Sequence, residues 1–136
     1  SNVIRDIAQK IAREKGLKVY SINDFTTHGY ADVNINDAGP LEFISLIRGA
    51  KYFISNSFHG TIFSLIFEIP FLVVKRTIGN VNSRMESLLQ MVGLENRLIG
   101  ESSELNKIKE IDFVNVKELM AQQTIKSSEL LKSILI

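Results

Sequence analysis

Residues 51–74 read KYFISNSFHGTIFSLIFEIPFLVV, and this stretch decides the fold that we expect. Residues 52–54 form a compact run of aromatic and β-branched side chains, which is typical of a strand. A polar turn follows at 56–59, and residues 61–68 predict a helix that is apolar nearly all round and therefore buried on most sides. Pro70 ends this helix, and residues 71–74 are a second, wholly apolar strand. Strand, helix and strand in this order predict parallel strands joined by a right-handed crossover, in a sheet covered on both faces.

Further helices and strands flank this unit in the sequence. Apolar residues at helical spacing predict helices that begin near Ile4, Pro40 and Ser83, and a glycine closes each of them. Alternation and apolar character predict strands at 18–22 and 98–99, whereas residues 23–39 are rich in Asn, Asp, Thr and Gly and predict a polar loop. A weakly helical segment lies at 103–110, and Asp112 is a candidate cap for a long C-terminal helix over residues 113–136.

The resulting fold class is α/β, with a Rossmann-like parallel sheet and helices on both of its faces. We expect a single domain of residues 1–136, because strands alternate with helices along the chain without a clear linker. In such sheets ligands bind beyond the carboxyl ends of the strands, and the polar turn after residues 52–54 lies at such an end.

Composition restricts the kinds of partner that this chain can have. Of its 136 residues, 45% are hydrophobic and 23% are charged, which is typical of a soluble globular protein. The formal net charge is +1, so no overall field attracts nucleic acid or anionic lipid, and local groups must hold any bound anion. There is no cysteine, which excludes disulfides and thiolate metal sites. We expect no membrane span, and we interpret the opening at Ser1-Asn2 as a cut from a longer protein.

The turn at Asn56 to Thr61 is the strongest candidate for a binding site. The first N–H groups of a helix lack partners inside the helix and, together with the helix dipole, attract anions. Gly60 allows a ligand to approach the backbone closely, and Ser57 and Thr61 offer hydroxyl groups. His59 adds a ring that can exchange a proton near neutral pH. A purely structural alternative stays open at this point, in which Ser57 only caps the helix and His59 only forms structural hydrogen bonds.

The sequence from Pro40 to Ile99 resembles the C-terminal part of the polysaccharide pyruvyl transferase family. The block Ser57-Phe58-His59-Gly60-Thr61 carries most of the resemblance. Shorter matching runs are Leu46-Ile47-Arg48-Gly49-Ala50-Lys51-Tyr52, Ile69-Pro70-Phe71, Asn82-Ser83-Arg84, Leu88-Leu89 and Gly93-Leu94-Glu95-Asn96-Arg97.

The resemblance implies an enzyme that moves a pyruvyl group from phosphoenolpyruvate to a sugar of a cell-surface polysaccharide, forming a ketal. It also implies a GT-B-like architecture, in which two Rossmann-like halves face a cleft and this chain is the C-terminal, donor-binding half. An N-terminal half of the same enzyme would then hold the saccharide acceptor, and this chain alone would be inactive. We expect no cofactor besides the donor substrate, and a cytoplasmic location.

Individual site residues follow from this resemblance and from their positions beside strands and helix starts. His59 is the candidate catalytic residue, as acid or as base, and its proton-transfer partner is not identified. The candidate donor-binding residues are Asn56, Ser57, Gly60, Thr61 and Arg84, since a guanidinium can grip a carboxylate or phosphate with two bonds. Three further candidates lie near the end of residues 71–74 or before Arg84, namely Lys75, Arg76 and Asn82. For Arg97 we expect a structural role that joins a helix to a loop.

Several other functions lack a motif in this sequence. Two histidines thirty-one positions apart, without nearby paired carboxylates, do not predict a metal site. No glycine-rich dinucleotide or ATP motif and no basic–aromatic interleaving occurs, so we expect neither such a cofactor nor a nucleic-acid partner. Two alternatives to the pyruvyl transferase stay open: a glycosyltransferase of the same architecture that uses a nucleotide sugar, and a non-catalytic interaction domain.

Overall fold

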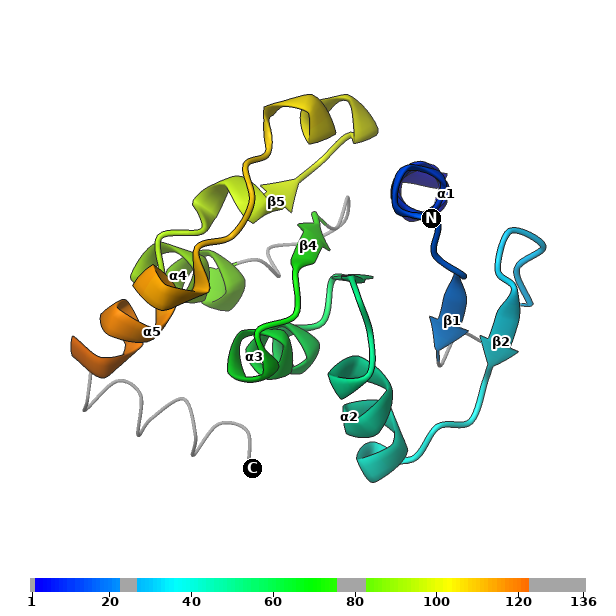
Figure 1. Cartoon of the computed structure of the whole chain (residues 1–136), viewed down its shortest axis with the longest axis horizontal. Coiled ribbons are helices and arrows are strands. Elements are labelled where there is room, and N and C mark those ends of the chain that lie inside the picture. Colours follow the sequence, from blue (N-terminus) through cyan, green and yellow to red (C-terminus); the bar gives the residue numbers. More distant parts are fainter. Residues whose placement is uncertain (1, 23–26, 76–82, 123–136) are drawn as a thin grey trace.

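The computed structural model describes residues 2–22, 27–75 and 83–122, and Figure 1 shows their arrangement. The helices are α1 (Asn2–Lys15), α2 (Pro40–Arg48), α3 (Phe58–Phe67), α4 (Ser83–Met91) and α5 (Phe113–Gln122). The strands are β1 (Tyr20–Ile22), β2 (Val33–Ile35), β3 (Phe53–Ser55), β4 (Phe71–Val74) and β5 (Leu98–Ile99). Two 3-10 helices, η1 (Glu95–Arg97) and η2 (Ser102–Lys107), flank β5.

All strand pairs among the described residues are parallel, as the sequence predicted. The pairs form a two-stranded sheet of β1 and β2 and a three-stranded sheet in the order β3-β4-β5. The prediction of a Rossmann-like sheet is therefore confirmed only in its parallel strands, because hydrogen bonding divides them into two open sheets. Figure 1 shows the two sheets at different places along the molecule, with β1 and β2 on the side opposite to β5.

One strand falls where we expected only loop. Val33–Ile35 pairs with Tyr20–Ile22 in register, so the prediction of a loop over residues 23–39 was wrong at this strand. Two hydrogen bonds between Asp32 and Val19 lie directly before the paired residues. The Asp32 backbone N–H donates to the Val19 carbonyl oxygen, and the Asp32 carboxylate accepts from the Val19 N–H at 2.7 Å. Pairing with β1 thus makes a strand of a three-residue segment that lies within a polar stretch of sequence.

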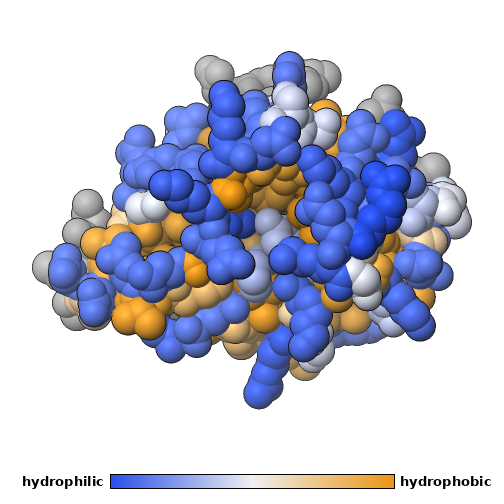
Figure 2. Space-filling view, turned by 45° about the horizontal axis from the view of Figure 1, so that its top comes forward, coloured by the Kyte–Doolittle hydropathy of each residue, from blue (hydrophilic) through white to orange (hydrophobic). Residues whose placement is uncertain are grey.

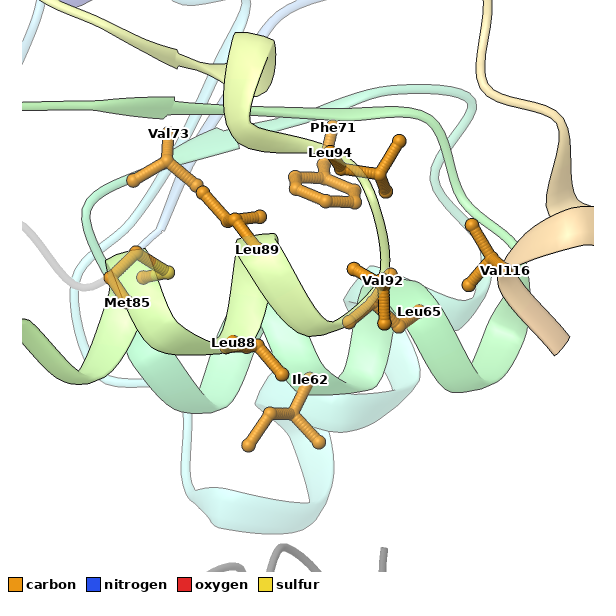
Figure 3. Packing of buried hydrophobic residues seen from close by; sticks show 10 residues of the cluster. All are labelled: Ile62, Leu65, Phe71, Val73, Met85, Leu88, Leu89, Val92, Leu94 and Val116. Carbon is orange, nitrogen blue, oxygen red and sulfur yellow. The ribbon is translucent and has the colours of Figure 1, made fainter. Parts of the chain in front are cut away.

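Strand β4 is buried on both faces, and helices cover both of them. Phe71 and Val73 point toward α3 and α4, and Leu72 and Val74 pack with Ile7 and Ile11 of α1. Figure 3 shows the larger cluster, in which side chains from β4, α3, α4, the segment after α4 and α5 pack together; its members are Ile62, Leu65, Phe71, Val73, Met85, Leu88, Leu89, Val92, Leu94 and Val116. The prediction of helices on both faces of the sheet is therefore confirmed for its three-stranded part.

Helix α3 begins earlier than the sequence predicted. It starts at Phe58, so His59, Gly60 and Thr61 belong to its first turn and not to the preceding turn or to a later helix start. Its end agrees with the prediction, since Glu68 adopts the left-handed conformation and Pro70 follows. The helix is less completely buried than we expected, because Ile66 keeps 43% of its surface exposed.

One face of the molecule carries both hydrophilic and hydrophobic side chains. Figure 2 shows one face, on which hydrophilic side chains project around smaller areas of hydrophobic surface. Leu41 is the most exposed of the large apolar side chains in the described ranges, at 81%. Among the helices that the structure describes, none combines the length and the apolar character that crossing a membrane requires.

Candidate functional site

The first turn of α3 is fixed by Ser57 and Thr61. Ser57 is the N-cap residue in an extended conformation, and its Oγ accepts a hydrogen bond from the Gly60 N–H at 3.0 Å. Thr61 is buried, and its Oγ1 donates to the Ser57 carbonyl oxygen at 2.9 Å. A third bond joins the Ser57 N–H to the Ser55 Oγ at 3.2 Å, which links the cap to the end of β3. Both hydroxyls that we proposed to bind the donor substrate therefore have hydrogen-bond partners within the protein. Any contact with a ligand would be additional to these.

Gly60 packs closely against β3. A Cβ atom at this position would lie 2.6 Å from Cε2 and 2.8 Å from Cζ of the Phe53 ring. Glycine is therefore required here so that the first turn of α3 can approach β3 closely. Close approach to an aromatic ring is thus one physical reason for this glycine, and the approach of a ligand to its backbone stays a prediction.

His59 and Arg84, which lie on different helices, meet at one aromatic side chain. The Phe58 ring lies edge-to-face against the His59 ring, with centroids 5.8 Å apart and planes at 86°. The guanidinium carbon of Arg84, at the second residue of α4, lies 4.1 Å from the centroid of the same Phe58 ring. His59 and Arg84 are both exposed. Two side chains that the sequence analysis proposed, one for proton transfer and one for anion binding, thus both contact the Phe58 ring.

The remaining candidates are distributed along the same edge of the sheet. Asn56 is exposed and directly follows β3, and Lys75 is exposed and directly follows β4. The aliphatic part of Lys75 lies close to Gly100, which follows β5, so this side chain leans away from the β3 side where His59 lies. Arg76 and Asn82 lie outside the described residues.

Arg97 occupies the opposite, amino-terminal edge of the sheet. Only 3% of its surface is exposed, and its guanidinium donates to the Tyr52 hydroxyl at 3.0 Å and to the Phe71 carbonyl oxygen at 3.1 Å. A further N–H donates to the Lys109 carbonyl oxygen, which ties η1 to the segment before α5. The expected structural role of Arg97 is confirmed, and the residue joins more segments than the helix and loop that we predicted.

Tyr52 shares this buried environment. Burial raises the pKa of its hydroxyl above the usual value, while the charge of Arg97 and the hydrogen bond from it act in the opposite direction. Because desolvation raises the pKa of the phenol, the hydroxyl stays neutral and accepts a hydrogen bond from the guanidinium.

Comparison with known families shows the family to which this chain belongs. The family model for polysaccharide pyruvyl transferases matches residues 3–77, which is more than half of the chain. The chain belongs to the polysaccharide pyruvyl transferase family. No curated protein and no solved structure matches the chain.

The extent of the family match differs from the resemblance that we drew. It begins in α1, well before Pro40, and it ends just after β4, before α4. It therefore includes the first turn of α3 with His59, and Lys75 after β4. Arg84 and Arg97 lie beyond the match, so their assignment depends on the geometry described above.

Phe58 is the residue at this site that the sequence analysis missed. We quoted it as part of the family-like block, placed it in the polar turn at 56–59 and gave it no function. The Phe58 ring contacts both His59, the next residue in the chain, and Arg84 on another helix. Sequence spacing does not predict the contact with Arg84. Among the described residues, no group of three or more His, Asp or Glu side chains is arranged to bind a metal ion.

Proposed function

We propose that this chain is the donor-binding half of an enzyme that transfers a pyruvyl group from phosphoenolpyruvate to a sugar, forming a ketal. Family membership supports pyruvyl transfer in polysaccharide chemistry. The observation that carries the finer proposal is that His59 and Arg84 both contact the Phe58 ring at the capped start of α3. An exposed proton-transfer group and an exposed cation that share one aromatic neighbour at a helix N-terminus suit a substrate that is both anionic and in need of a proton.

The proposed reaction defines what His59 has to do. Two hydroxyl groups of the sugar form bonds to the central carbon of the donor, and the bond from that carbon to the phosphate oxygen breaks. Of the two hydroxyl protons, one ends on the methylene carbon, which becomes a methyl group, and the other leaves with phosphate. His59 handles one of these protons, as the base for a hydroxyl or as the acid for the methylene carbon.

Donor binding requires positive or N–H groups for a carboxylate and a phosphate. Arg84 offers a planar fork of N–H groups for one of them. Asn56 and the backbone at the start of α3 are the next candidates, because the hydroxyls of Ser57 and Thr61 already serve the helix cap. Lys75, Arg76 and Asn82 remain candidates of lower rank.

The proposal extends to the rest of the enzyme. An N-terminal half would hold the saccharide acceptor across a cleft, in a GT-B-like arrangement of two Rossmann-like halves. We place the reaction in the cytoplasm, before export of the polysaccharide. These points rest on the family and on its implied architecture.

The test is a substitution of each of the two histidines of the chain in the complete enzyme. For His59→Ala we expect the rate of ketal formation to fall by roughly 10²- to 10⁴-fold, because general acid–base catalysis contributes that much. Thermal unfolding should be unchanged, since the side chain is exposed. His28→Ala is the matched control and should leave the rate unchanged, because His28 lies in the loop before β2 and bonds Asn34 through its backbone.

Undiminished ketal formation by His59→Ala would remove His59 from the mechanism. A parallel titration separates the substrate classes that the sequence left open. Binding of phosphoenolpyruvate, with no binding of nucleotide sugars, supports pyruvyl transfer, and the reverse result supports a glycosyltransferase.

A further inference from the structure

The Phe58 ring contacts the two functional side chains at once, and its own position is fixed by the fold. Phe58 is the first residue of α3, half-buried, and packed against the main hydrophobic cluster. The Ser57 cap and the Thr61 hydroxyl hold the backbone of this turn from the other side. The ring is therefore a rigid surface, and it lies between α3 and the beginning of α4.

Arg84 is much less constrained without this ring. It is exposed and lies at the second residue of α4, and in the described ranges no carboxylate forms an ion pair with it. A free arginine side chain has several rotatable bonds, and fixing them when a ligand binds weakens the affinity. The contact at 4.1 Å with the Phe58 ring removes part of that freedom in advance.

The kind of contact also matters for anion binding. An aromatic ring attracts a guanidinium through the ring face, and this attraction uses none of the in-plane N–H groups of the guanidinium. A carboxylate in the place of the ring would hold Arg84 equally well but would occupy those donors and neutralise the charge. The aromatic contact therefore keeps Arg84 in place and leaves it able to bind an anion.

We propose that Phe58 is a positioning residue, which holds the Arg84 guanidinium against its ring so that an anionic group of the donor binds at the start of α3. This inference rests on the proposed function, since it assigns Arg84 to the donor. Phe58 itself does not touch the reacting atoms. Its effect on the donor passes through Arg84, and this dependence makes the inference testable.

The experiment compares Phe58→Leu with Phe58→Tyr, each with Arg84 present and with Arg84→Ala, in the complete enzyme. Phe58→Leu keeps an apolar side chain but removes the ring face, and we expect it to raise the KM for phosphoenolpyruvate about threefold while kcat changes less. Phe58→Tyr keeps the ring, and its KM for phosphoenolpyruvate should equal that of the unsubstituted enzyme. With Arg84→Ala, Phe58→Leu should cause no further rise in KM. The inference would be overturned if Phe58→Leu still raised KM in the Arg84→Ala background, or if it lowered kcat and left KM normal.

A second measurement keeps this inference separate from the choice of donor. In NMR spectra of the 136-residue chain, the Phe58 ring should shift the side-chain Nε–H signal of Arg84. The shift should persist in Phe58→Tyr and disappear in Phe58→Leu. If this holds but phosphoenolpyruvate is not bound, the proposed function fails while the positioning of Arg84 stands. If the shift is absent from the unsubstituted chain, the positioning role is wrong whatever the donor is.

Discussion

The two ends of the three-stranded sheet use the same residue type in opposite ways. At the amino-terminal end, Arg97 is 3% exposed and gives its N–H groups to Tyr52, Phe71 and the Lys109 carbonyl. At the carboxyl end, Arg84 is exposed and rests on the Phe58 ring, a contact that consumes no N–H donor. Arg97 therefore stabilises the fold, whereas the N–H donors of Arg84 are not used by this contact, which suits the donor-binding role that we propose for it. The difference teaches that the surroundings of a guanidinium, and not its presence in a family-like run, decide its role.

The carboxyl end itself has an inner and an outer side. The inner side of the first α3 turn consists of Gly60 and Thr61, which are buried against Phe53 and the Ser57 carbonyl. The outer side presents Asn56 and His59, which are exposed. Tight packing on the inner side fixes the geometry of the outer side, as a preorganised binding site requires.

The largest effect that we expect on stability separates the two arginines. Arg97→Ala should lower the free energy of unfolding by about 3 kcal/mol, because it leaves buried acceptors unpaired and creates a cavity. Arg84→Ala should change it by less than about 1 kcal/mol, since it removes only an exposed cation–π contact. Denaturant unfolding of both variants measures this difference. Equal destabilisation would break the comparison, because both arginines would then be structural.

A smaller effect tests the inner side of the α3 start. Gly60→Ala should lower the free energy of unfolding by about 2 kcal/mol, because the added methyl group would lie 2.6 Å from the Phe53 ring. Adding Phe53→Leu should recover part of this loss by giving the methyl group room. Thermal unfolding of the single and double variants checks the prediction. A Gly60→Ala chain of normal stability would mean that the turn can move away from β3, and the packing argument would fail.

The smallest effect concerns Tyr52 at the amino-terminal end. Because burial raises its pKa in the folded chain, the folded state holds the phenol proton more tightly than the unfolded state does. This contribution to stability is complete below about pH 10, the unfolded value, and is lost as the pH rises through the folded value. Unfolding free energies measured across the alkaline range should therefore decline more steeply for the unsubstituted chain than for Tyr52→Phe. Parallel curves for the two proteins would show that the phenol is not buried in solution.

Much of the fold was predictable from local patterns. The wholly apolar run 71–74, the Pro40 helix start and Asp112 as a cap were all read correctly, and the Asp112 carboxylate accepts from the N–H groups of Val114 and Asn115. The strand Val33–Ile35 was missed because its pairing with β1 depends on Asp32 and Val19, which lie outside the strand itself. The prediction of a C-terminal helix over 113–136 is confirmed through Gln122, and its remainder lies outside the described residues.

The candidate site was predictable in part. Asn56, Ser57 and His59 were found because they follow an apolar strand, and the capping role of Ser57 was stated as an alternative and is confirmed. The contact of Gly60 with Phe53 was not predicted, and the approach of a ligand at Gly60 stays a prediction. Phe58 was missed because its partner Arg84 is twenty-six positions away and on another helix.

By itself the sequence determined the strand, helix and strand of residues 52–74, the buried strand β4 and the polar segment that leads into α3. These features depend on neighbouring residues, whose spacing and capping act over a few positions. Only the tertiary structure decided which arginine is buried, which glycine is packed and which ring lies under Arg84. Such roles depend on contacts between segments far apart in the chain, and local propensity carries no information about them.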